Sequence, residues 1–288
     1  MNLETSVTIN INTPIPICVD YYIQTKAQYY KSYLGTIQYR LARISKWFSS
    51  YTLKDLTTSP DARNNISEFI NHRLSTVKAG TVRKDASALQ AMLNWYRKDY
   101  GLAIPDIFKQ IRIPKDYAQR TFIPTDEQVY EVIGKLPSDD LKDVCLLLAE
   151  TGCRRNEILN LRIQDVNTAK RMIVCNNTKN GTNRTVPLSR TAVAIFNKHL
   201  ERLEGRAGTY LVFNIRGEFV SKQFRKAADS CHAYDFVIHS LRHYRLSKLI
   251  QAGHDHLLVS KVSGHKDVRT LSRYVHLDAT DLAMMLFD

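Results

Sequence analysis

In the segment Thr151-Gly152-Cys153-Arg154-Arg155-Asn156-Glu157, a glycine follows a predicted helix and an arginine comes directly after the turn. The helix is predicted over residues 138–150 because apolar side chains recur at three- to four-residue spacing from Leu141 to Leu148. Arg154 would therefore lie at a helix end, where its planar guanidinium can donate two parallel hydrogen bonds to phosphate oxygens. A surface or salt-bridging arginine is the alternative explanation.

The residues around this segment predict a small sheet within a mainly helical domain. Two strand candidates, 172–175 and 184–187, flank residues 177–183, which contain Asn180-Gly181, a strong signal for a tight turn. We therefore expect a β-hairpin with Lys179 near its tip. Helical periodicity predicts the other elements of this part of the chain, over 125–136, 189–204, 221–230, 240–252, 256–262 and 268–274.

Arg154 and five further polar residues form one ordered set that suits phosphodiester chemistry: Lys179, His239, Arg242, His265 and Tyr274. Direct attack on a phosphodiester adds negative charge at phosphorus, which fixed arginines stabilise without a metal. A phenol has a pKa near 10 and needs basic neighbours to become a nucleophile, and Tyr274 lies in Arg273-Tyr274-Val275-His276. A lysine at a hairpin tip could protonate the leaving 5′-oxygen. The set favours cleavage and rejoining of DNA strands.

Each member of the set also has an ordinary explanation. Lys179 fits a solvated turn, and His265 fits a loop or packing histidine. His239 and Arg242 are three residues apart and would share a helix face, but this spacing is common. His239 and His243 have the four-residue spacing of metal ligands, although Arg242 between them would repel a dication. A metallohydrolase stays as a rival hypothesis.

The first part of the chain predicts a compact bundle of about four helices. Apolar residues at helical spacing mark helices from about residue 17, over 34–48, from Pro60-Asp61 onward, and in a long helix capped at Gly80-Thr81. The sequence therefore predicts five segments: an extended arm at 1–14, a helical domain at 15–110, a basic linker at 111–124, a mixed domain at 125–278 and an apolar tail at 279–288.

The charge balance of the chain favours a polyanionic partner. Of 288 residues, 41 are Lys or Arg and 28 are Asp or Glu, so the formal net charge is +13. The five cysteines are dispersed, which argues against a disulfide framework or a zinc ribbon and favours reduced thiols in a cytoplasmic protein. We expect no signal peptide and no membrane span, because neither a leader pattern nor an apolar run of sufficient length is present.

Four motifs together resemble the tyrosine recombinase (phage integrase) family. They are Thr-Gly-x-Arg-x-x-Glu at 151–157, Thr-Lys followed by Arg-x-Val-Pro-Leu at 178–188, His-x-Leu-Arg-His at 239–243, and Gly-His followed by Tyr-x-His at 264–276. The helical stretch 20–110 resembles the core-binding (SAM-like) domain of that family more loosely. Ser263 stands where the family usually has an aliphatic residue before Gly-His. Arg155 adjoins Arg154, so the arginine of the first motif could also be assigned one residue later.

The resemblance implies a role for each residue of the set. Arg154 and Arg242 would bind the scissile phosphate, and Lys179 would protonate the leaving oxygen. Tyr274 would form a covalent 3′-phosphotyrosine. The remaining roles implied are proton handling and phosphate contacts by His239 and His265, and structural support by Glu157.

The same resemblance implies partners and leaves alternatives open. The partner would be double-stranded DNA, bound by a homo-tetramer that assembles from monomers and exchanges strands through a Holliday junction, without metal, ATP or other cofactor. The tail would pack on a neighbouring protomer, or else on its own domain. An accessory DNA-bending or directionality factor is compatible with this scheme, and no arm-binding domain is expected. A type IB topoisomerase-like enzyme and a non-catalytic DNA-binding protein are the alternatives.

Overall fold

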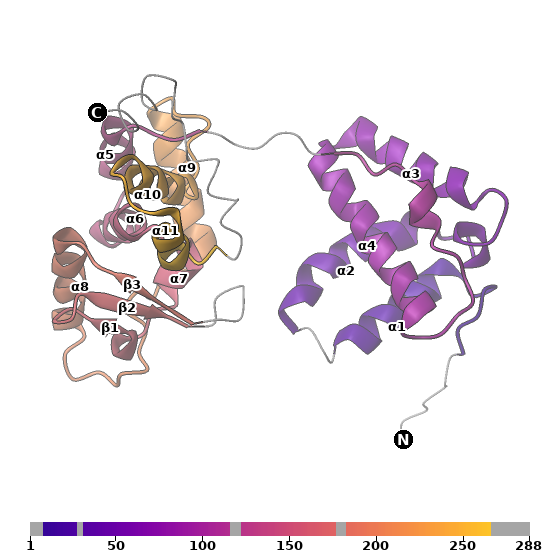
Figure 1. Cartoon of the computed structure of the whole chain (residues 1–288), viewed down its shortest axis with the longest axis horizontal. Coiled ribbons are helices and arrows are strands. Elements are labelled where there is room, and N and C mark those ends of the chain that lie inside the picture. Colours follow the sequence, from indigo (N-terminus) through magenta and orange to yellow (C-terminus); the bar gives the residue numbers. More distant parts are fainter. Residues whose placement is uncertain (1–7, 28–30, 116–121, 177–182, 266–288) are drawn as a thin grey trace. The chain divides into compact units, whose positions relative to one another are not determined.

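The computed structural model describes residues 8–27, 31–115, 122–176 and 183–265 of the chain. The chain divides into two compact units, Met1–Gln119 and Arg120–Asp288, and each has its own apolar core. Figure 1 labels their elements. Within the described residues, no helix has the length and apolar character needed to cross a bilayer.

The first unit is a helical bundle, as the apolar periodicity predicts. Its elements are α1 (Ile15–Ala27), α2 (Lys31–Trp47), α3 (Ala62–Thr76) and α4 (Ala79–Lys98), with two short 3-10 turns, η1 (Lys54–Leu56) and η2 (Ile107–Gln110). Large side chains fill the core between the helices, among them Phe48, Phe69 and Tyr96. Ile9, from the segment that precedes α1, is buried in the same core.

The second unit places seven helices, within its described residues, around a small antiparallel sheet. The helices are α5 (Asp126–Gly134), α6 (Asp139–Thr151), α7 (Arg155–Leu159), α8 (Arg190–Arg202), α9 (Gly217–Ser230), α10 (Ser240–Gln251) and α11 (His256–Ser263), with one 3-10 turn, η3 (Ile163–Asp165). The strands are β1 (Val166–Asn167), β2 (Met172–Cys175) and β3 (Arg184–Pro187), in the order β1-β2-β3. The hairpin of β2 and β3 is confirmed, with Cys175 opposite Arg184.

Several helix boundaries follow from side-chain caps that the sequence displays. Thr125 and Gln128 form a reciprocal capping box at the start of α5. Ser138 Oγ accepts from Leu141 N at the start of α6, and Ser189 Oγ accepts from Ala192 N at the start of α8. These caps satisfy backbone donors that have no partner within the helix.

Three predicted helix starts are wrong, and one strand was not predicted. Helix α2 begins at Lys31 rather than at residue 34. Helix α4 begins at Ala79, so Gly80-Thr81 lies inside its first turn; the Lys78 carbonyl closes that turn without any side-chain cap. Helix α9 begins at Gly217 rather than at residue 221, because Val220 is buried in the core and extends the apolar face by one turn. Strand β1 has two residues, too few to show an alternating pattern.

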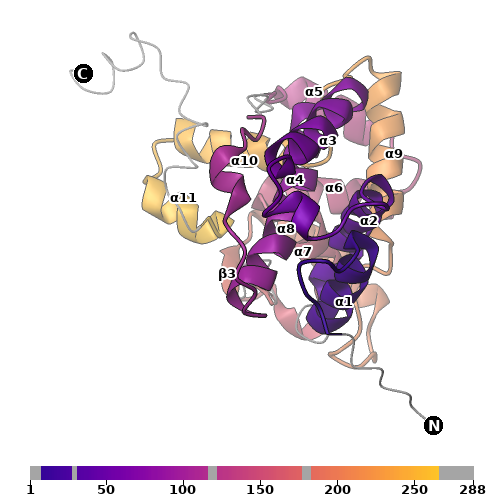
Figure 2. The same ribbon diagram turned by 90° about the vertical axis from the view of Figure 1, so that its right-hand side faces the viewer.

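The packing of the second unit brings together the ends of four helices and one strand, and these ends carry the candidate site. Helix α10 packs on α6, and α11 lies beside β3 in both views of the molecule (Figures 1 and 2). The end of α6, the start of α7, the start of α10, the end of α11 and the start of β3 therefore meet.

Candidate active site

The turn between α6 and α7 depends on Gly152. Its φ of +66° lies in the left-handed region, where glycine has no steric penalty. Thr151 Oγ1 donates to Leu147 O at 2.6 Å and accepts from Cys153 N at 3.2 Å, which fixes the chain on both sides of the turn. The turn places Arg154 at the N-cap of α7.

Glu157 holds Arg154 at this position through two hydrogen bonds. Its Oε2 accepts from Arg154 N at 2.7 Å, and its Oε1 accepts from Arg154 Nη1 at 2.9 Å. The side chain of Arg154 keeps 27% of its surface exposed, so its remaining donors can reach a ligand. Arg155 points elsewhere, because its Nη1 donates to Ser221 Oγ on α9 at 2.6 Å.

Arg184, at the start of β3, completes the surroundings of Glu157. Its Nη1 and Nη2 donate to the two carboxylate oxygens at 2.7 and 2.8 Å. Burial by itself would raise the pKa of Glu157, but the hydrogen bonds from Arg184, and then those from Arg154, outweigh it and lower the pKa to about 2. Glu157 is therefore ionised at any physiological pH.

Arg242 is a buried cation whose hydrogen bonds go to neutral groups. Its side chain lies in the first turn of α10, and the residue is 2% exposed. Nη1 donates to Gly152 O and Nη2 donates to Ser263 O, both at 2.7 Å. Among the described residues, no ion pair joins Arg242 to a carboxylate. Burial, and then the charge of Arg154, lower the pKa of Arg242 to about 10, so it stays protonated near neutral pH.

His265 stands next to Arg242 because of a second glycine turn. Gly264, with φ +71°, ends α11, and Ser260 Oγ donates to His265 O at 2.7 Å. The ring nitrogens lie 2.8 Å (Nδ1) from Ser263 Oγ and 3.4 Å (Nε2) from Arg242 Nη2. Since Ser263 Oγ also donates to Ser260 O at 3.2 Å, these contacts fit a neutral ring that donates from Nδ1 and presents the Nε2 lone pair to Arg242.

His239 occupies the N-cap of α10, one turn before Arg242. Arg242 N donates to His239 O at 3.2 Å, as the three-residue spacing predicts. The His239 side chain is exposed, and its ring lies edge-on to the ring of His243 with centroids 4.8 Å apart. Lys179 and Tyr274, the predicted acid and nucleophile, lie outside the described residues.

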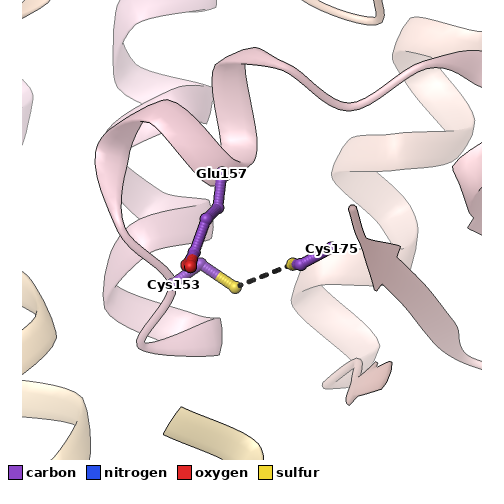
Figure 3. A group of neighbouring side chains, drawn as sticks. All are labelled: Cys153, Glu157 and Cys175. Carbon is purple, nitrogen blue, oxygen red and sulfur yellow. Dashed lines mark hydrogen bonds between the residues drawn. The ribbon is translucent and has the colours of Figure 1, made fainter. Parts of the chain in front are cut away.

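Two groups of possible metal ligands occur among the described residues, and neither contains the predicted pair His239 and His243. Figure 3 shows the first, Cys153, Glu157 and Cys175, whose two sulfurs are 3.8 Å apart. Both Glu157 oxygens already accept from arginines, and Arg184 Nη2 lies 3.8 Å from Cys153 Sγ. A dication would be repelled by these guanidinium groups, so the surroundings of the group do not suit a metal ion.

The second group of possible ligands is also engaged by cations. Asp143 accepts from His199 Nε2 at 2.8 Å and pairs with Lys198, and Asp140 pairs with Arg202 at 3.1 Å. This group ties α6 to α8, and its carboxylates are neutralised by the protein itself.

Sequence reasoning missed two residues that build this site. Arg184 was visible only as the first residue of the Arg-x-Val-Pro-Leu pattern, and Ser263 was noted only as a departure from the usual aliphatic residue. Arg184 binds Glu157, and Ser263 contacts both Arg242 and His265. No local pattern indicates the contact of Arg184 with Glu157 or that of Ser263 with Arg242, because each joins segments that meet only in the folded unit.

Residues 125–281 match the model of the phage integrase family. Among curated proteins, the chain is similar to a putative integrase/recombinase of Haemophilus influenzae, with 29% identity over 83% of this chain and 80% of that protein. It is also similar to the tyrosine recombinase XerA of Saccharolobus solfataricus, with 25% identity over 77% of this chain and 78% of that protein.

Solved structures of low sequence identity share the fold. The Tn1549 transposon integrase, in complex with a circular intermediate DNA, matches with a TM-score of 0.73 and 15% identity over 95% of this chain and 98% of that chain. A lambda integrase dimer bound to a COC′ core site matches with a TM-score of 0.72 and 18% identity over 90% of this chain and 94% of that chain. Since the family match covers more than half of the sequence, the chain belongs to the phage integrase family and is a site-specific tyrosine recombinase that acts on DNA.

Proposed function

We propose that this recombinase cleaves and rejoins DNA strands through a covalent 3′-phosphotyrosine formed by Tyr274. The observation that carries the proposal is Arg242, a buried guanidinium that forms no ion pair with a carboxylate among the described residues. Burying an unpaired charge is costly, so a site built this way favours an anionic ligand. Arg154 lies near enough to lower the pKa of Arg242, which supports the proposal that the two arginines bind the same phosphate.

The chemical step follows from the residues assigned to it. The Tyr274 phenol gives its proton to a histidine of the site as its oxygen attacks the scissile phosphorus, a new P–O bond forms, and the bond to the 5′-oxygen breaks. Arg154 and Arg242 stabilise the extra negative charge of the five-coordinate transition state. Lys179 gives a proton to the leaving 5′-oxygen, and His239 and His265 assist proton handling and phosphate contacts. Glu157 supports Arg154.

Rejoining is the same step in reverse, with a 5′-hydroxyl as the attacking group. One phosphodiester is exchanged for another phosphate ester, so the reaction requires neither ATP nor a metal ion. The helical unit at 15–110 and the catalytic unit at 125–278 are joined by 111–124, and we propose that each of them contacts DNA. Strand exchange between two sites requires four protomers, so we propose a tetramer on DNA in which the tail 279–288 contacts a neighbour. Accessory DNA-bending or directionality factors are compatible with this assembly.

One experiment tests the covalent step directly. The protein is incubated with a nicked suicide substrate, whose cleaved end diffuses away, in buffer that contains EDTA. We expect a denaturant-resistant protein–DNA adduct with the wild type and none with Tyr274→Phe, which should still bind the DNA. An adduct with the phenylalanine variant would overturn the choice of nucleophile, and an adduct that requires Mg²⁺ would overturn the metal-free mechanism.

A further inference from the structure

Arg184 lies between three segments that carry site residues. It is the first residue of β3, directly after the hairpin connection, and its side chain is 9% exposed. Besides the two bonds to Glu157, its Nε donates to Val262 O near the end of α11 at 2.8 Å. A Cβ at residue 264 would lie 3.1 Å from Arg184 Cδ, so Gly264 gives the arginine room to pass.

These contacts place Arg184 and Arg242 side by side on the end of α11. The carbonyls of Val262 and Ser263 are consecutive, and they accept from Arg184 Nε and Arg242 Nη2 respectively. Arg184 thus joins the hairpin, the residue that holds Arg154 and the turn that carries His265. No ligand needs to touch Arg184 for it to influence all three.

The charges of the cluster suggest why an arginine is needed there. Glu157 Oε1 accepts from both Arg154 Nη1 and Arg184 Nη1, so one negative charge is shared between two cations. Arg154, Arg184 and Arg242 carry three positive charges and Glu157 one negative charge, which leaves +2 when the neighbouring thiols and His265 are neutral. A phosphodiester under attack reaches two negative charges in its five-coordinate transition state. The cluster matches that charge.

We propose that Arg184 is a positioning residue that takes up the charge of Glu157, so that Arg154 remains available to the phosphodiester in the transition state. The inference rests on the proposed function of Arg154 and Arg242. Without Arg184, Glu157 would neutralise Arg154 in a single ion pair, and the cluster would carry only +1. The loss should appear in the chemical step more than in DNA affinity, because Arg184 itself is not a DNA ligand.

The test distinguishes a role of Arg184 through its charge from a purely structural role. Single-turnover adduct formation on the suicide substrate is measured with protein in excess, and DNA affinity is measured in parallel. We expect Arg184→Met to lower the cleavage rate by about 100-fold, a typical cost of losing stabilisation of a developing oxyanion, with DNA affinity nearly unchanged. Adding Glu157→Gln removes the unshared negative charge and restores a cluster charge of +2. The double variant should therefore cleave at least about tenfold faster than Arg184→Met alone. A purely structural role for Arg184 predicts a double variant slower than the single one.

Two further variants keep the test decisive. Arg225 on α9 also bridges a carboxylate and a backbone carbonyl, those of Asp229 and Tyr234, so Arg225→Met removes the same charge and the same kinds of bond and should cleave normally. If Arg184→Met does not fold, Arg184→Lys keeps the charge and should cleave within about tenfold of the wild type. The inference is overturned if Arg184→Met cleaves like the wild type, if the double variant gains nothing, or if Arg184→Lys is inactive although folded. Absence of any adduct with the wild type would instead refute the proposed function.

Discussion

Arg242 Nη2 donates to Ser263 O at 2.7 Å, across 21 residues, and its Nη1 donates to Gly152 O across 90. One guanidinium thus donates hydrogen bonds to both glycine-containing turns, the one before Arg154 and the one before His265. The carbonyls orient its fork without neutralising it, so the charge remains available to an anion. This arrangement resembles other oxyanion sites, in which donors are fixed before the charge develops.

Arg242→Lys should reduce the cleavage rate by about 100-fold or more, because one ammonium cannot hold both carbonyls and a phosphate in the geometry of a planar fork. The measurement is adduct formation on the suicide substrate. Arg245→Lys, one turn along α10, is the matched control and should leave the rate unchanged. Equal rates for the two lysine variants would show that Arg242 does not act on the phosphate.

Glu157→Gln should destabilise the second unit at neutral pH by about 3 kcal/mol, from the depression of the carboxyl pKa from 4.5 to about 2. A carboxyl with a lowered folded-state pKa contributes its full stability above the unfolded pKa and loses it as pH falls through the folded pKa. The difference between variant and wild type should therefore be largest above about pH 5 and shrink toward pH 2.

Urea unfolding followed by circular dichroism across this pH range measures the difference. Tryptophan fluorescence separates the two units, because both tryptophans, Trp47 and Trp95, belong to the first. A pH-independent difference would show that the carboxylate charge of Glu157 is not what stabilises the turn.

Asp85→Asn should destabilise the first unit strongly. The Asp85 carboxylate is fully buried and pairs with Arg40 at 2.7 Å, Arg43 at 3.3 Å and Arg73 at 3.2 Å. Its loss leaves three guanidinium groups facing one another, at a cost of about 3 kcal/mol. Urea unfolding monitored by tryptophan fluorescence measures the cost, and Asp61→Asn, at an exposed N-cap without a side-chain cap bond, should change stability little. Similar midpoints for both variants would contradict the prediction.

Deletion of residues 279–288 should weaken assembly on DNA while leaving cleavage of a single site intact. The segment lies outside the described residues, but its sequence Leu282-Ala283-Met284-Met285-Leu286-Phe287 is apolar, and apolar surface is unfavourable in water. Sedimentation of the protein with a DNA site measures the assembly. Unchanged assembly together with a lower melting temperature would place the tail on its own domain instead.

The sequence alone determined the family motifs and most element types, because these depend on local chemistry. The capping box of Thr125 and Gln128, the glycine at the end of α6 and the hairpin of β2 and β3 each follow from residues close together in the chain. The same reasoning placed Arg154 at a helix end and Arg242 in a first turn. The predicted start of α4 was wrong because no side chain caps this helix. A backbone carbonyl accepts the hydrogen bonds of its first turn, and since every residue has such a carbonyl, the sequence carries no signal for it.

Only the tertiary structure decided which charges share a partner. Arg184 and Glu157 are 27 residues apart, and Ser263 reaches Arg242 only because α10 and α11 pack beside α6 and β3. Ion pairs and carbonyl contacts of this kind leave no periodic signal, since they depend on distances between segments and not on spacing within one. The sequence therefore supplied the reactive groups, and the packing of the second unit determined how their charge is distributed.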